Sequence, residues 1–171
     1  MWVLWFAVGA WGEAVYPAVD TGGRWTDQRV DAARALRDLG WRGERFGVSV
    51  REGDVWWGDA EATVAFDSPK AVGPATQRRV VMRWYKARDA AGRVFGDGVD
   101  RPGLVLVHSL HPQMVLARAI ARGVSDAGWH VLVMELPGYG ARAGRRGVFP
   151  GVVAIESGGQ AVVDARRAWD A

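Results

Sequence analysis

Three absences narrow what this chain of 171 residues can be: it has no cysteine, no long apolar run and no block of like charges. Without cysteine there is no disulfide, no thiolate metal site and no cysteine nucleophile. A bilayer-spanning helix takes about 20 apolar residues, and the sequence holds no such run. The net charge is +3, but the arginines are spread along the whole sequence. We therefore expect no nucleic-acid partner and no stable membrane span.

The remaining composition, with 49% hydrophobic and 24% charged residues, is that of a folded globular domain or part of one. Residues 1–14 are a distinct segment, in which the apolar MWVLWFAVGAW is followed by Gly12, Glu13 and Ala14. The small residues at 12 and 14 fit the cleavage site of a signal peptide, although no positive residue precedes the apolar run. The alternatives are a terminal strand and a mis-started reading frame. We treat 15–171 as one domain and leave open whether the chain is exported or cytoplasmic.

A helix and a β-rich region are predicted in the first half of this domain. Residues 26–39 have apolar residues at helical spacing, and Gly40 suits the position after a helix. Short β-like runs separated by turn residues follow, and they predict an antiparallel region of a few strands. The apolar helix positions are Val30, Ala33, Leu36 and Leu39, and the β-like runs are 46–50, 54–57, 62–66 and 78–85.

A strand–helix–strand unit of about 30 residues is predicted next. Residues 103–107 (GLVLV) and 130–134 (HVLVM) are continuous apolar runs, as in strands buried on both faces. Such a crossover joins parallel strands, whose carboxyl ends carry the functional residues of α/β proteins. The region is therefore α/β, with candidate functional residues at 108–112 and 135–140. The helix begins at Pro112 and ends at Gly128, with Leu116, Ile120, Val124 and Ala127 on one face.

Neither a dinucleotide nor a metal is indicated. Glu135, at the end of the second strand, has the place of a ribose-binding acid, but the turn HSLHPQ after the first strand holds no glycine for a pyrophosphate to approach. His108 and His111 are three residues apart, whereas His130 opens a strand and so lies at the opposite end of the sheet. Because zinc needs three or four converging ligands, we predict no metal and no cofactor.

Residues 102–140 resemble a known family. The segments LVLVHSLHP, LARAIARGVSDAGW and VLVMELPGYGAR are similar to the third strand, oxyanion loop, helix A, fourth strand and following loop of the α/β-hydrolase superfamily. The similarity is greatest to its esterase and dienelactone-hydrolase-like members. Residues 160–171 resemble the family's helix B. The resemblance implies a partial α/β-hydrolase fold, in which a β-rich N-terminal region precedes the parallel unit and the chain ends before the nucleophile strand.

The resemblance also implies roles for two loops. His108 and Ser109 stand where the family has a His-Gly pair, and the backbone at Ser109 or Leu110 would stabilise the oxyanion of a tetrahedral intermediate. The second loop stands where the family has D-x-P-G-x-G and would form a pocket edge. Its residues are Glu135, Pro137, Gly138, Tyr139 and Gly140.

The family's nucleophile motif, G-x-S-x-G, does not occur in the sequence. The nearest serine is Ser157, in IESGG, where Ile155 replaces the glycine that relieves crowding at the nucleophile turn. Ser157 and Gln160 also fit an S-x-x-Q capping box at the start of a terminal helix, which gives Ser157 a structural role. The family's acid and histidine follow the nucleophile in the chain, so His108 and His111 are not the triad histidine.

We therefore expect an N-terminal portion of a serine hydrolase, itself inactive, whose intact form cleaves a small carboxylic ester or related acyl bond without a cofactor. A chain that ends before the nucleophile strand is expected to leave the strand at 130–134 as a bare edge that favours aggregation. The alternative is a non-catalytic, β-rich ligand-binding module with a degenerate hydrolase-like unit, in which tryptophans such as Trp56 and Trp57 form the ligand surface. Substrate and oligomeric state are left open.

Overall fold

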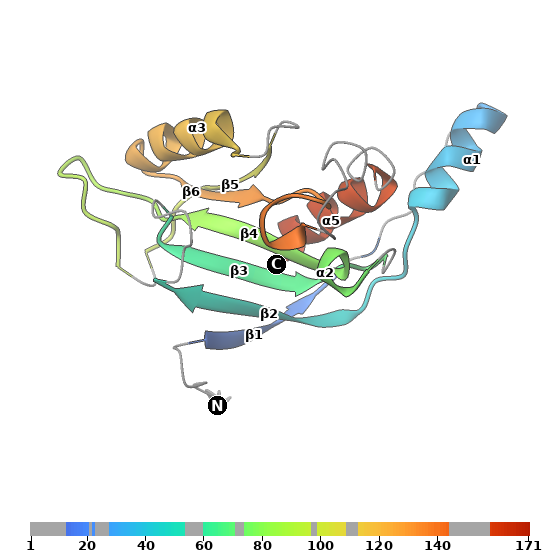
Figure 1. The fold of residues 1–171 in the computed structure, drawn as a ribbon, viewed down its shortest axis with the longest axis horizontal. Helices are drawn as coiled ribbons and strands as arrows, with labels where there is room; N and C mark the ends of the chain where they lie inside the picture. The colour runs from blue at the N-terminus through green and yellow to red at the C-terminus, as the bar shows by residue number, and fades with distance from the viewer. Residues whose placement is uncertain are drawn as a thin grey trace.

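The computed structural model describes residues 13–20, 22, 28–53, 60–70, 74–96, 99–108, 113–143 and 158–171. Helices lie on both sides of one sheet (Figure 1). The elements are β1 (Glu13–Val19), α1 (Val30–Leu39), β2 (Arg45–Glu52), β3 (Ala62–Asp67), α2 (Ala75–Arg78), β4 (Arg79–Tyr85), β5 (Gly103–Val107), α3 (Val115–Asp126), β6 (His130–Met134), the 3-10 turn η1 (Gly140–Arg142) and α5 (Gly158–Asp170).

The described strands form a mixed six-stranded sheet in the order β1-β2-β3-β4-β6-β5. Strands β1 to β4 pair antiparallel in sequence order, β4 pairs antiparallel with β6, and β5 pairs parallel with β6. The α/β class, the antiparallel region and the parallel strand–helix–strand unit are thus confirmed. The β-like run at 54–57 lies outside the described residues.

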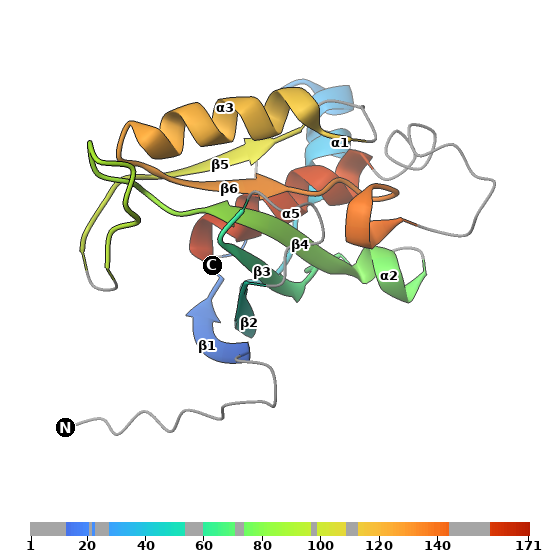
Figure 2. The same ribbon diagram turned by 60° about the vertical axis from the view of Figure 1, so that its left-hand side comes forward.

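The two faces of the sheet bury different helices (Figure 2). Side chains alternate along a strand, so Met82 and Met134 pack with α5 residues such as Ala165 on one face. Tyr85 and Val133 pack with α3 on the other face. This alternation divides the core into two layers, one on each side of β4 and β6.

The prediction that the strand at 130–134 is a bare edge is wrong. This strand is β6, and it is paired on both sides, by β4 and by β5. Among the described strands β5 and β1 are the two edges, and the residues of β5 are partly exposed, contrary to the expectation of a strand buried on both faces. The physical reason is that β4, from the antiparallel region, occupies the far side of β6.

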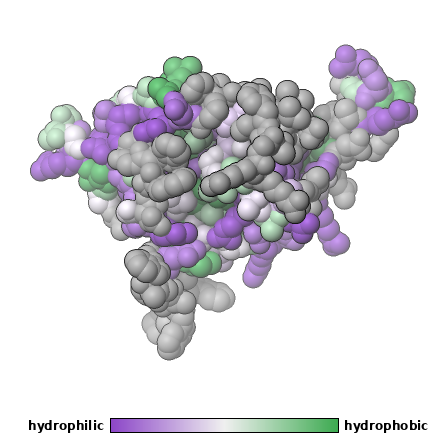
Figure 3. Space-filling view, viewed as in Figure 1, coloured by the Kyte–Doolittle hydropathy of each residue, from purple (hydrophilic) through white to green (hydrophobic). Residues whose placement is uncertain are grey.

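The apolar face predicted for α3 also differs from the face that is buried. Leu116 is 64% exposed and Ile120 is 42% exposed, whereas the small residues Ala117 and Ala121 pack against the sheet. Small side chains let the helix approach the strands closely, and the larger apolar residues are left on its outer side. Figure 3 shows hydrophobic atoms on the surface over α3, at the top of the view.

The first helix projects from the body of the molecule (Figure 1). Val30, predicted on its apolar face, is 76% exposed, while Leu39 at the other end lies close to Gly159 of α5. No helix in the described ranges is long and apolar enough to cross a bilayer. Strand β1 begins at Glu13, so two residues of the apolar segment 1–14 belong to the sheet. Residues 1–12 lie outside the described ranges, and their role as a signal peptide stays a prediction.

Candidate functional site

His108 meets the second predicted loop where the parallel strands β5 and β6 end. Val107 pairs with Met134 in register, so His108 and Glu135 follow the two strands at the same edge of the sheet. The Nε2 atom of buried His108 accepts a hydrogen bond of 3.1 Å from the backbone N–H of Leu136. Its ring also packs edge-on against Tyr139, with the ring centroids 4.8 Å apart. The structure thus brings His108, the first residue of one predicted loop, into contact with the loop at 135–140.

The second loop is held by the carboxylate of Glu135, which is fully buried. One carboxylate oxygen accepts a hydrogen bond of 2.7 Å from Nε of Arg83, and the other accepts one of 2.7 Å from the backbone N–H of Ala141. The carboxylate is therefore part of the loop's own structure. It is not placed to bind the ribose of a dinucleotide, which removes the acid that the dinucleotide hypothesis required.

A glycine is required at position 140 by the same carboxylate. Gly140 has a φ of +49°, and a Cβ atom there would lie 2.5 Å from Oε2 of Glu135. Because Glu135 is fixed by Arg83 and Ala141, it has little freedom to move aside. Gly138 also has a positive φ, of +89°. The two glycines of the G-x-G pattern therefore allow the chain to turn tightly around the buried carboxylate.

Beneath this loop lies a buried ion pair that the sequence did not indicate. The guanidinium of Arg142 donates to Asp164 of α5, at 2.8 Å, and to the backbone carbonyl oxygens of Glu135 and Gln77. Ser68 donates to the other oxygen of Asp164. Burial raises the pKa of Asp164, opposed by the positive charge of Arg142 and by these hydrogen bonds. The pair joins η1, α2 and α5 under the candidate site.

The phenol of Tyr139 lies inside the loop with an unusual environment. The side chain is buried, and among the described residues its hydroxyl has no hydrogen-bond partner. Burial raises the pKa of Tyr139, so the hydroxyl is neutral at neutral pH. The Tyr139 ring packs against the side of the His108 ring, and the backbone N–H of Leu136 donates a hydrogen bond to the same imidazole. Tyr139 is therefore a positioning residue for the loop that His108 opens.

His130 lies at the other end of the sheet, as predicted. Its Nδ1 atom accepts hydrogen bonds from Nε1 of Trp84, at 3.2 Å, and from the backbone N–H of Ala87, at 3.1 Å. It cannot join His108 in a metal site. Among the residues that the structure describes, no group of three histidine, aspartate or glutamate side chains is arranged to hold a metal ion.

A pH-dependent stability is expected from His130. Burial, together with the charges of Lys86 and Arg101, lowers the pKa of His130 below its usual 6.5. The unfolded chain therefore takes up this proton first, and the free energy of unfolding should fall as the pH drops below about 6.5. His130→Asn keeps an acceptor near the Nδ1 position and does not titrate. Urea unfolding at about pH 7.5 and about pH 5.5 should show that the free energy of unfolding falls less for this variant than for the natural chain. Equal falls would contradict the lowered pKa of His130.

Several predicted site residues lie outside the described ranges. These are the oxyanion-loop residues Ser109 and Leu110, His111, and Ser157. Their proposed roles stay predictions. Helix α5 begins at Gly158, the residue after Ser157, where the capping box predicts a helix start.

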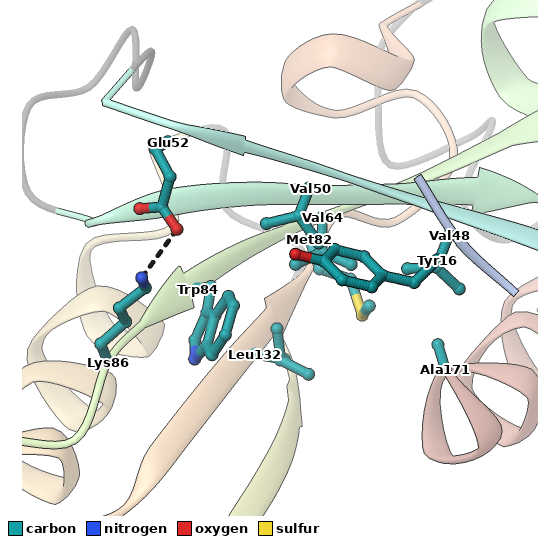
Figure 4. A pocket seen from close by; sticks show the side chains of 10 residues that line it. All are labelled: Tyr16, Val48, Val50, Glu52, Val64, Met82, Trp84, Lys86, Leu132 and Ala171. Atoms are coloured by element: carbon teal, nitrogen blue, oxygen red, sulfur yellow. Dashed lines mark hydrogen bonds and ion pairs between the residues drawn. The ribbon is translucent and has the colours of Figure 1, made fainter. Parts of the chain in front are cut away.

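A second concave feature lies on the α5 face of the sheet, away from the two loops (Figure 4). It is a hollow of about 350 Å³ with a mostly apolar lining that includes Met82, Trp84 and Leu132. At one end Nζ of Lys86 lies 2.7 Å from a carboxylate oxygen of Glu52 and 4.9 Å from the centre of a Trp84 ring. The tryptophans predicted to form a ligand surface, Trp56 and Trp57, lie outside the described residues, and Trp84 was not predicted to line a site.

Comparison of the chain with family models and with curated proteins found no match in either case.

Proposed function

We propose that this chain carries the oxyanion-loop portion of a serine hydrolase that cleaves a small carboxylic ester or a related acyl bond. The observation that supports it is that His108 follows β5 at the carboxyl ends of adjacent parallel strands and accepts a hydrogen bond from Leu136 in the loop after β6. Acyl transfer needs backbone N–H groups that are fixed in place before charge develops on the substrate oxygen. The backbone at Ser109 or Leu110, directly after His108, would supply them.

In this proposal His108 positions the loop and does not act as the general base. Its Nε2 accepts a hydrogen bond from the backbone and its ring is buried against Tyr139, so that nitrogen is not available to take a proton from a serine. Each oxyanion donor of this kind is typically worth about 10²- to 10³-fold in rate. Because His108 is held by both Leu136 and Tyr139, donors directly after it would be kept in place without reorganisation.

The nucleophile would come from a strand that joins the sheet beside β5. The sequence contains no G-x-S-x-G, and β5 has a free edge among the described strands. Next to this edge Val107 is exposed, together with Leu116 and Ile120 of α3. An additional parallel strand with its own covering element would pair with β5 and bury these side chains, which would complete a partial α/β-hydrolase fold.

The proposal predicts that the 171-residue protein does not hydrolyse esters. Purified protein should turn over p-nitrophenyl acetate no faster than its Ser157→Ala variant, because Ser157 has the place of a helix cap and lacks the preceding glycine of a nucleophile turn. The measurement is the release of p-nitrophenolate. Saturable turnover that Ser157→Ala abolishes would show instead that this chain holds its own nucleophile.

The ligand-binding module is a second candidate, and the hollow beside Trp84 favours it. An apolar lining with one charged pair at its end is typical of small-molecule sites, and 350 Å³ is within their usual range. A glycan or short peptide that binds there should quench tryptophan fluorescence saturably, and Trp84→Phe should remove most of that change. No saturable change with any such ligand, together with ester hydrolysis by a longer chain, would favour the enzyme.

A further inference from the structure

The two edge strands of the described sheet differ in their protection against pairing with another strand. Prolines and charges on an edge hinder such pairing. In β1, Pro17 lies near the middle of the strand. Its missing N–H is on the outer side, because the N–H of Asp20 bonds inward to Glu44 and backbone groups point to alternate sides along a strand. Strand β5 (GLVLV) contains neither proline nor charge, so it is the edge that is open to a further strand.

The outward-facing backbone groups of β5 can be identified from its pairing with β6. The carbonyl oxygen of Pro102 accepts a hydrogen bond of 2.9 Å from the N–H of His130, so this carbonyl faces β6. Every second residue after Pro102 also bonds to β6 in the parallel ladder. The residues whose N–H and carbonyl groups face the outer edge are therefore Gly103, Val105 and Val107.

The apolar flank of α3 lies on the same side of the molecule as this edge. Arg122 bonds to Glu61 at 2.9 Å and lies over the ring of Tyr85 in β4, so its side of the helix faces β4. Successive helical residues are about 100° apart, which places Ile120 roughly 160° and Leu116 roughly 120° around the helix from Arg122. Both therefore face toward β5, along which α3 runs in Figure 2, and both are exposed.

We propose that a second copy of this chain covers this surface, in a two-fold symmetric dimer whose two β5 strands pair antiparallel. With Val105 on the axis, each outward-facing residue of one copy lies opposite an outward-facing residue of the other. Such pairs exchange both N–H···O bonds, so every outward backbone group of β5 gains a partner. The sheets of the two copies would join into one.

The side chains of β5 are complementary to themselves in this register. Val107, which is 44% exposed, lies opposite Gly103 of the second copy. A Cβ atom added at Gly103 would meet nothing within 4 Å, so this position has open space for a neighbouring side chain. Leu104 lies opposite Leu106 of the second copy, on the face that packs with α3. Because the strand carries no charge, no like charges meet across the axis.

The helices fit the same symmetry. The two-fold axis places the two α3 helices antiparallel on one face of the joined sheet, with their apolar flanks toward each other. These flanks carry no charged residue and consist of Leu116, Ile120, Gly123 and Ala127. Pairing β5 with itself leaves only the β1 edges of the described sheets, which Pro17 protects, so association closes at two copies.

The dimer does not depend on the proposed hydrolase function. A strand supplied by a longer chain would compete for the same edge, so the proposal concerns the chain of 171 residues. An absent nucleophile strand would overturn the hydrolase and leave the dimer unaffected, whereas a monomeric 171-residue chain would overturn the dimer alone.

Size-exclusion chromatography with light scattering tests the proposal, on the full chain between about 1 and about 100 µM. We expect twice the mass of one chain at the higher concentrations. Leu116→Lys and Val107→Pro should each raise the dissociation constant of the dimer about tenfold or more. Leu116 is 64% exposed and the N–H of Val107 faces the outer edge, so neither change removes a hydrogen bond of the single chain. Circular dichroism checks that both variants fold.

The matched control is Val115→Lys, which adds the same charge at the neighbouring position. Val115 is 56% exposed and lies two helical turns before Arg122, on the side of α3 that is turned away from the β5 edge. This variant should change the dissociation constant by less than about twofold, since its charge stays in solvent. The proposal is overturned by a single-chain mass at every concentration, by a mass that grows beyond two copies, by Val115→Lys acting as strongly as Leu116→Lys, or by an unchanged dimer in folded Val107→Pro.

Discussion

Asp164→Ala is expected to lower the free energy of unfolding by about 3–5 kcal/mol. Asp164 and Arg142 are both fully buried. Removing the carboxylate leaves the guanidinium of Arg142 without a counter-ion, and a guanidinium cannot lose its charge in a protein. Ser68 would lose its hydrogen bond to the carboxylate at the same time. Urea unfolding followed by circular dichroism measures the loss, and the midpoint should fall without a change in slope.

Two variants make this prediction specific. Asp67→Ala removes an exposed carboxylate that lies 3.7 Å from Arg79, and it should cost less than about 1 kcal/mol. Adding Arg142→Met to Asp164→Ala removes the stranded charge, so the double variant should recover part of the stability. If Asp164→Ala costs no more than Asp67→Ala, the buried pair does not hold η1 and α5 together.

Glu135→Ala is expected to cost about 3 kcal/mol or more and to loosen the loop that follows β6. The change leaves Arg83 without its carboxylate and the N–H of Ala141 without its acceptor. Amide hydrogen exchange at Ala141 should therefore become faster than the drop in global stability alone explains. Unfolding in urea and exchange measured by NMR provide the two readings.

Glu135→Gln separates the two contacts of this side chain. An amide oxygen can still accept from Ala141, but the ion pair with Arg83 is lost. The free energy of unfolding of this variant should therefore lie between those of the natural chain and the alanine variant. Glu52→Ala is the control, because Glu52 pairs with Lys86 while being half-exposed. Unchanged exchange at Ala141 in Glu135→Ala would mean that the carboxylate does not hold the loop.

The parallel unit could be predicted from the sequence because its signals are local. The apolar runs of β5 and β6 and the spacing of α3 all lie within about 30 neighbouring residues. Which strand forms the edge could not be predicted, because it depends on pairing between β4 and β6, some 50 positions apart. The buried face of α3 was missed because the pattern favours large apolar residues such as Leu116, whereas close packing on a sheet uses alanine. Strand β1 was anticipated only as the terminal-strand alternative for residues 1–14, and its bounds were not predicted.

The position of the candidate site could be predicted from the sequence, but the side chains that hold its loop could not. His108 and the loop at Glu135 follow the ends of two recognisable strands, so their meeting follows from parallel pairing. The side chains that hold the loop gave no such signal. Arg142 lies in an arginine-rich stretch that is typical of a solvated loop, and its partner Asp164 is 22 residues away on a helix. Only the folded chain shows that Arg142 is buried.

The most direct test of the proposed hydrolase role is to sequence the source DNA beyond the Ala171 codon. The proposal predicts an open frame that soon encodes an apolar strand followed by G-x-S-x-G, the element that would pair beside β5. A stop codon there, with no such motif in any frame behind it, would contradict it, and the hollow beside Trp84 would then be the better guide to function.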